Sequence, residues 1–324
     1  MKRTAKPIAM IMAFMLFIIL SACSSGANPA GGAKSDAQPA SAAKKLRIGL
    51  TVPTLSNPFF VAMSKGAQEA ASKFNAEVIT VSADQDLAKQ TAQIEDFITK
   101  KVDLILLSPF DSKGIAAAVA QAKAANIPVI AVDGFAEGGI NSVVMSDNVM
   151  AGTLAGEYLA KRLNGKGNIV IMDGPPVSAV TDRIRGFEEV MKKYPEIKVL
   201  SKQNGEGNRE KALSVMENIL QANKKIDAVF AINDPEGVGI KIAAEQAGRG
   251  SEFFIVGVDG APDAVTALKE KKAFAATSAQ FPNEMVIKAV ELGLQLKEGK
   301  SIESKVLIPV ELIAQENVDQ YRGW

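Results

Sequence analysis

The stretch that decides the fold reads Leu46-Arg-Ile-Gly-Leu-Thr-Val52, and after one proline the chain continues Thr54-Leu-Ser-Asn-Pro-Phe-Phe60. The apolar run is typical of a buried β-strand, and Asn57 followed by Pro58 indicates the N-cap and first residue of a helix. Two adjacent phenylalanines are unusual at a helix entry, which is normally polar. Apolar rings at the carboxyl edge of a strand lie where open α/β sheets bind small molecules, and they suit the C–H patches of a sugar ring. A purely structural role, in which both rings fix the helix to the sheet, is an equally open interpretation.

Apolar runs and amphipathic segments alternate along the rest of the chain. The candidate strands are Leu46–Val52, Glu77–Val81, Leu104–Ser108, Pro128–Val132, Ser142–Ser146, Asn168–Met172, Lys198–Ser201, Ala228–Asn233, Phe253–Val258, Phe274–Gln280 and Lys305–Leu312. Strands of continuous apolar character indicate a parallel sheet covered by helices on both faces. About eleven strands are too many for one sheet, so we predict an α/β protein of two doubly wound lobes.

Polar side chains follow several of these strands, at the edge where crevice ligands bind. They are Ser108, Asp133, Asn233, Asp259 and Gln280, and Arg183 lies near the start of the helix after Asn168–Met172. Each has a structural alternative, because such residues also cap helices or form Asp-Gly turns. As a set distributed over both halves, they predict a ligand cleft.

The first residues predict an exported lipoprotein. Lys2, Arg3 and Lys6 form a basic region, an apolar stretch follows at 8–20, and Leu20-Ser-Ala-Cys23 resembles a bacterial lipobox. We therefore expect a signal peptide over residues 1–22, with cleavage before Cys23 and lipid on its thiol. Cys23 is the only cysteine, which excludes an internal disulfide. The Ala-, Gly-, Ser- and Pro-rich residues 23–44 are predicted to form a flexible, lipid-anchored linker.

Composition excludes several classes of function. Without residues 1–22 the chain has 34 basic and 36 acidic residues, and this near-neutral balance argues against nucleic-acid binding. The chain has no histidine, which removes the commonest general base and most zinc sites. No phosphate-binding loop or dinucleotide fingerprint occurs, so we expect no cofactor and no metal. Catalysis by carboxylates alone, for example a glycosidase that uses Asp133 and Asp259, is a remote alternative.

A series of motifs resembles a known family. They are N-P-F-F at 57–60, S-P-F-D-S at 108–112, S-D-N at 146–148, R-x-R-G-F at 183–187, N-D-P at 233–235, V-G-V-D-G-x-P-D at 256–263 and A-Q-F-P at 279–282. In this order they resemble the ribose-binding-protein branch of the periplasmic (type 1) sugar-binding proteins, the extracytoplasmic receptors of ABC importers. The resemblance covers essentially all of residues 45–324.

The resemblance implies two Rossmann-like lobes, a three-segment hinge between them, and a ligand cleft that closes around the ligand. We expect one lobe at 45–146 plus 280–309, and the other at 147–279 plus 310–324. The positions that match the family's ligand contacts are Asn57, Phe59, Phe60, Asp133, Arg183, Asn233, Asp259 and Gln280, and Ser108 is added as a further candidate.

The chain departs from a ribose pocket at five positions. The family pattern implies Ser at Pro53, Asn at Ser108, Arg at Gly134, and aromatic side chains at Gly207 and Val258. Smaller or apolar residues there predict a roomier wall in the second lobe, and thus a hexose, a polyol or a disaccharide rather than ribose.

We therefore expect a non-enzymatic solute-binding protein of the bacterial cell envelope. It would be a monomer, tethered to the membrane by the lipid on Cys23, that delivers a sugar or polyol to an ABC permease and its ATPase. The alternative is a sugar sensor that signals to a chemoreceptor or a sensor kinase.

Overall fold

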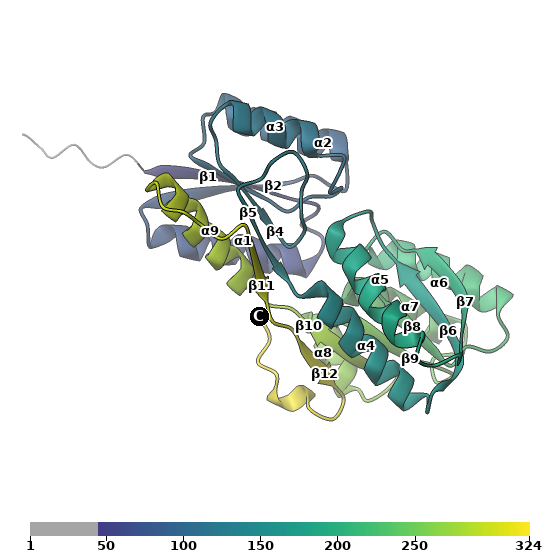
Figure 1. The fold of residues 1–324 in the computed structure, drawn as a ribbon. Helices are drawn as coiled ribbons and strands as arrows, with labels where there is room; N and C mark the ends of the chain where they lie inside the picture. Colours follow the sequence, from purple (N-terminus) through teal and green to yellow (C-terminus); the bar gives the residue numbers. More distant parts are fainter. Residues whose placement is uncertain (1–44) are drawn as a thin grey trace, which may run out of the picture. The chain divides into compact units, whose positions relative to one another are not determined.

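The computed structural model describes residues 45–324. The predicted signal peptide, the lipidation site Cys23 and the linker up to residue 44 lie outside the described residues. Within residues 45–324, strands and helices alternate almost throughout (Figure 1). In that part of the chain no helix combines the length and the apolar character needed to span a membrane.

The strands form two six-stranded sheets. In spatial order, the first contains β11 (Lys305–Ile308), β5 (Ser142–Ser146), β4 (Val129–Val132), β3 (Leu104–Leu107), β1 (Leu46–Val52) and β2 (Ala76–Ser82). The second contains β12 (Glu311–Ala314), β10 (Phe274–Ala279), β9 (Phe254–Asp259), β8 (Ala228–Ala231), β6 (Lys166–Asp173) and β7 (Glu196–Asn204). The strands of both sheets are parallel to their neighbours, apart from β12, which is antiparallel to β10.

Helices cover both faces of each sheet. On the first sheet, α1 (Pro58–Ser72) and α9 (Pro282–Lys297) pack side by side on one face, with α2 (Leu87–Thr99) and α3 (Ala116–Ala124) on the other. On the second sheet, α4 (Asn148–Arg162) and α5 (Ser178–Met191) cover one face, and α6 (Arg209–Ala222), α7 (Asp234–Gln246) and α8 (Pro262–Lys269) cover the other. The apolar strands are therefore buried on both sides, which confirms the predicted doubly wound α/β fold.

The chain passes between the two sheets three times, as the predicted three-segment hinge requires. The crossings lie between β5 and α4, between β10 and α9, and between β11 and β12. The last crossing corrects one predicted element, because the candidate strand at 305–312 is two short strands in different sheets. Pro309, which directly follows β11, has no N–H to donate to a strand ladder, so the strand ends there.

Helix caps shape the turns that follow the strands. Asn57 accepts a hydrogen bond from the Phe59 N–H at 2.9 Å, and Pro58 occupies the first turn of α1. Asn233 caps α7 in the same way, with its Oδ1 accepting from the Glu236 N–H at 3.0 Å. Both asparagines were predicted as ligand contacts. Their capping bonds use the side-chain oxygen, and the amide nitrogen is a separate donor.

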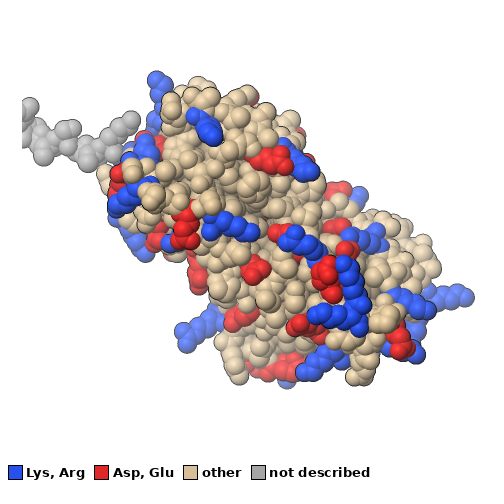
Figure 2. Space-filling model, viewed as in Figure 1, with Lys and Arg blue, Asp and Glu red and all other residues tan. Residues whose placement is uncertain are grey.

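The surface carries charges of both signs. Figure 2 shows basic and acidic side chains interspersed over the visible face, without a stripe of one sign. This matches the near-neutral composition and the many exposed ion pairs, such as Lys166 with Glu196 at 3.3 Å.

Candidate ligand-binding site

A pocket of about 610 Å³, its part open to solvent included, lies at the carboxyl ends of strands from both sheets. Eight of the nine predicted ligand contacts line it: Asn57, Phe59, Phe60, Asp133, Arg183, Asn233, Asp259 and Gln280. The two halves of the chain thus converge on one pocket.

Ser108 is the predicted contact that is not among the lining residues. Its side chain is fully buried, its hydroxyl has no hydrogen-bond partner, and its carbonyl accepts from Gln90 at 2.8 Å. Among the residues that follow β3 in the chain, Pro109 and Phe110 line the pocket instead.

Phe59 and Phe60 belong both to the hydrophobic core and to the lining of the pocket. They are only 3% and 9% exposed and belong to the core beneath α1, yet both line the pocket. Their rings meet edge to face with centroids 5.3 Å apart. Trp324 adds a second edge-to-face contact to Phe59 at 5.7 Å, so the Phe59 ring is fixed from two sides.

Asp133 contributes an acceptor with no partner. It follows β4 with a φ of +70°, in the left-handed region, and its Oδ1 is buried without a hydrogen bond in the described structure. Burial raises the pKa of this carboxyl to about 6, although the nearby Arg183 guanidinium acts in the opposite direction.

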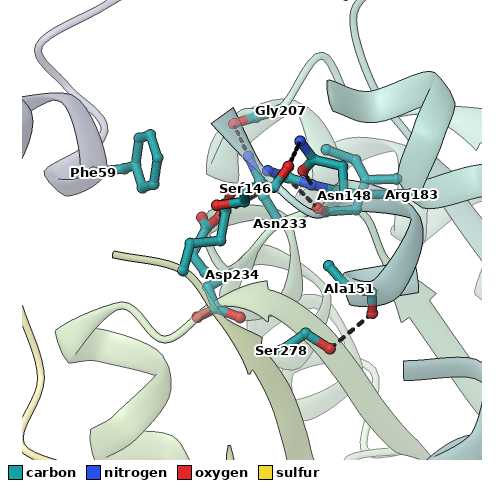
Figure 3. Close-up of polar contacts among 12 residues, drawn as sticks. Phe59, Ser146, Asn148, Ala151, Arg183, Gly207, Asn233, Asp234 and Ser278 are labelled. Carbon is teal, nitrogen blue, oxygen red and sulfur yellow. Dashed lines mark hydrogen bonds and ion pairs between the residues drawn. The ribbon is translucent and has the colours of Figure 1, made fainter. Parts of the chain in front are cut away.

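Arg183 lines the pocket and supplies a positive charge to it. Its Nε donates to Asn148 Oδ1 at 2.8 Å and its Nη1 donates to the Ile232 carbonyl at 2.9 Å (Figure 3). Asn148 in turn donates to the Ser146 carbonyl at 3.1 Å. Ser146 and Asn148, at the first hinge crossing, therefore orient the guanidinium of Arg183. The sequence analysis quoted the S-D-N motif at 146–148 but assigned it no such role.

Asp259 and Gln280 form a hydrogen-bonded pair. The Gln280 amide nitrogen donates to Asp259 Oδ1 at 2.7 Å, and the same oxygen lies 3.8 Å from Arg183 Nη1. Burial raises the pKa of Asp259 to about 7, while Arg183 and then Gln280 act to lower it. The Gln280 Oε1 atom is buried and has no partner, so it is a second acceptor at the pocket wall.

Asp234 lies next to Asn233 in the chain but has a structural role. Its two carboxylate oxygens accept from the Thr277 hydroxyl at 2.7 Å and the Ala261 N–H at 2.8 Å. It is fully buried and does not line the pocket. Asp234 therefore connects the start of α7 to the turn after β9, and burial raises its pKa well above the usual range.

The loop between β7 and α6 carries two residues that line the pocket, Glu206 and Gly207. The sequence analysis did not identify Glu206, and it considered Gly207 only as a position where the family has a larger side chain. Glu206 lines the pocket, and its carbonyl accepts from Gln85 of the first lobe at 2.9 Å. The backbone of Gly207 makes two hydrogen bonds to side chains. Its carbonyl accepts from Asn233 at 3.0 Å (Figure 3), and its N–H donates to Glu236 Oε1 at 2.8 Å. Of the remaining positions that depart from the ribose pattern, Pro53 lines the pocket, Gly134 is not among its lining residues, and Val258 belongs to the core.

The arrangement can bind a polyhydroxylated molecule but offers little for catalysis. A hydroxyl both donates and accepts, and the eight predicted contacts that line the pocket supply a guanidinium, two carboxyls, three amides and two aromatic rings. No cluster of three potential metal ligands occurs among the described residues.

Comparison with known proteins supports this geometry. A family model described as "Periplasmic binding protein domain" matches residues 48–301. The chain belongs to the periplasmic binding protein family. The ribose import binding protein of Bacillus subtilis is 36% identical to it over 317 residues, which cover 96% of this chain and 99% of the relative. The predicted family and the prediction that the protein is not an enzyme are thereby confirmed.

Solved structures of this family have the same fold. An ABC transporter solute-binding protein from Bacillus halodurans, with bound myo-inositol, matches with a TM-score of 0.80 and 30% identity, over 86% of this chain and 97% of its own. A second, from Actinobacillus succinogenes with bound D-allose, matches with a TM-score of 0.79 and 31% identity, over 86% and 100%.

Proposed function

We propose that this protein captures a sugar or polyol outside the cytoplasm and delivers it to an ABC importer. The observation that carries the proposal is the pocket itself. Arg183, the two buried carboxyls of Asp133 and Asp259, and two phenylalanines all line it, and Arg183 Nη1 lies 3.8 Å from Asp259 Oδ1. The relatives that bind ribose, D-allose and myo-inositol support a ligand of this class.

The eight lining residues named above are the ligand contacts of this proposal. We propose the lobe boundaries at 146/147, 279/280 and 309/310, which the distribution of the strands between the two sheets supports. We also propose that the protein binds its ligand as a monomer.

A thermal-shift screen tests the ligand class. The purified protein is heated with D-ribose, D-allose, xylitol or myo-inositol, and calorimetry follows for each compound that raises the melting temperature. A ligand at 100 times its Kd adds about 2.7 kcal/mol of stability, which corresponds to a rise of about 5 °C or more. An Arg183→Met variant that folds should lose the response. The absence of any shift across sugars and polyols would count against the proposal.

We further propose that lipid on Cys23 anchors the protein to the membrane, with residues 23–44 as a tether. The lipobox-like Leu20-Ser-Ala-Cys23 supports this. Cys23→Ala should move the protein from the detergent phase to the aqueous phase in a partitioning assay, while sugar affinity stays unchanged. A mutant that still partitions with detergent would refute the anchor.

A further inference from the structure

Trp324 is the only tryptophan in the chain, and it contacts two pocket residues that lie on opposite lobes. Its indole Nε1 donates to the Asp259 carbonyl at 3.1 Å. Its ring meets the Phe59 ring edge to face, with centroids 5.7 Å apart and an interplanar angle of 85°. Trp324 is not itself among the lining residues of the pocket.

The hydrogen bond to Asp259 supports an unfavourable backbone conformation. Asp259 has a φ of +138°, which residues with a side chain rarely adopt. Its carbonyl accepts two hydrogen bonds, from the Gln280 N–H at 2.9 Å and from the Trp324 indole. This conformation directs the carboxylate to Gln280 and Arg183, as the distances of 2.7 and 3.8 Å show. Loss of the indole donor would leave a single bond at this carbonyl.

The contact between Trp324 and Phe59 supports a pocket residue of the first lobe. Phe59 is 3% exposed and lies between Phe60 on one side and Trp324 on the other, with both contacts edge to face. The ring that lines the pocket therefore depends on Trp324 for one of its two aromatic neighbours. One side chain thus supports an aromatic contact in the first lobe and a charged contact in the second.

We propose that Trp324 is a positioning residue that sets the relative placement of Phe59 and Asp259 and thereby determines sugar affinity. This rests on the proposed function, because both residues are taken there as ligand contacts. Since Trp324 touches both, its indole also reports directly on occupation of the pocket.

A sugar-free measurement comes first. The single indole N–H gives one signal in a nitrogen–proton NMR spectrum, and a hydrogen-bonded N–H exchanges slowly with solvent. We expect clear protection compared with N-acetyltryptophanamide. Exchange at the free rate would overturn the inference, whatever the sugars do. Failure of the wild-type protein to bind any sugar of the panel would instead count against the proposed function.

Binding measurements on three variants then test the positioning role, with the tightest-binding compound among D-ribose, D-allose, xylitol and myo-inositol as the probe. Trp324→Phe keeps an aromatic ring but removes the donor, and should weaken binding about three- to tenfold. Trp324→Ala removes both contacts and should weaken it further. Asn317→Ala is the matched control, because the Asn317 side chain bonds within the same C-terminal segment: its Oδ1 accepts from the Ala314 N–H and its amide nitrogen donates to the Leu312 carbonyl.

The control separates positioning from general stability. Asn317→Ala should lower the melting temperature and leave affinity within about twofold of wild type. In the wild type, the indole signal should shift on titration with the sugar, and Asp259→Asn should change that shift. Wild-type affinity in Trp324→Phe and Trp324→Ala, or an equal loss in Asn317→Ala, would overturn the proposal.

Discussion

Asp259 and Asp133 bring two carboxyls into a pocket that contains one guanidinium. They are 3% and 8% exposed, and Arg183 is 4% exposed, so all three groups are largely removed from water. Burial of a charge is costly unless hydrogen bonds and an opposite charge compensate. Arg183 has its own bonds to Asn148 and Ile232, but Asp133 Oδ1 has none. The pocket is therefore arranged for a partner that supplies hydroxyl donors.

Asp259→Asn should reduce sugar affinity strongly. The change keeps the size and the tolerance for positive φ, but it removes the charge that faces Arg183. A charge-assisted hydrogen bond contributes roughly 1.5–3 kcal/mol, so binding should weaken by about one to two powers of ten. Calorimetry with the best sugar of the panel measures this. Asp263→Asn, on the exposed start of α8, is the control and should bind normally. Equal affinity in both variants would mean that Asp259 only shapes its turn.

The same substitution should make stability less dependent on pH. The pKa of Asp259 in the folded protein is raised to about 7 and that of Asp133 to about 6, above the ordinary value of 3.8. Between pH 4 and 7 the folded state therefore binds more protons than the unfolded state, and stability without sugar falls as pH rises. Asp259→Asn should match wild type near pH 4, melt increasingly higher than wild type as the pH rises, and differ most at pH 8. Parallel melting curves for the two proteins across pH 5–8 would contradict this.

Among the elements, strand ends were the most predictable part of the site. A polar residue directly after an apolar run located Asp133, Asn233, Asp259 and Gln280, because parallel strands end at one edge of a sheet. The same pattern failed at Ser108. Side chains alternate between the faces of a strand, and the sequence does not say which way the residue after a strand points.

Residues whose role depends on loop conformation could not be found from the sequence. Glu206 lines the pocket because it and Gly207 adopt φ of +57° and +65°. Asn148 and Glu236 act through side-chain hydrogen bonds to residues 35 and 29 positions away in the chain. These pairings arise from packing between elements, whereas periodicity and spacing report only on local structure.

The loop between β7 and α6 should depend on Glu236. This residue is fully buried in the first turn of α7, and its Oε1 accepts the Gly207 N–H. Glu236→Ala removes that acceptor and should weaken binding about three- to tenfold. Burial raises the pKa of Glu236 well above its usual range, which favours the neutral carboxyl, so Glu236→Gln should bind within about twofold of wild type. Calorimetry measures the sugar affinity of both variants. Equal losses of affinity in Glu236→Gln and Glu236→Ala would contradict the role of Glu236 as the acceptor of the Gly207 N–H.

At the scale of the whole molecule, hydrogen bonds connect the two lobes beyond the eight proposed ligand contacts. The Ser178 N–H donates to Ser112 Oγ at 3.0 Å, and Ser178 Oγ accepts from the Phe135 N–H at 2.7 Å. Gln85 reaches the Glu206 carbonyl of the other lobe at 2.9 Å. These contacts favour the arrangement in which the lobes meet, and they involve none of the eight proposed ligand contacts.

Ser178→Ala, alone and with Ser112→Ala, should therefore weaken every sugar by the same factor. If the sugar binds tightly only when the lobes meet, the apparent affinity falls with the population of that state, whatever the ligand. Loss of one or two hydrogen bonds predicts a reduction of about three- to tenfold. The loss should appear mainly in the dissociation rate, because the closing contacts hold the bound sugar in place. Surface plasmon resonance with the four-compound panel measures both rates.

The ratio of affinities between sugars is the decisive quantity for this prediction. A substitution inside the pocket, such as Asp259→Asn, alters individual sugar contacts and should change the order of preference. A substitution between the lobes should preserve that order while lowering each affinity. Thr181→Ala is the matched control on the same helix, because its hydroxyl bonds only to the Ser178 carbonyl. A changed order of preference in Ser178→Ala would place Ser178 in ligand recognition, and an unchanged affinity would show that these contacts do not hold the lobes together.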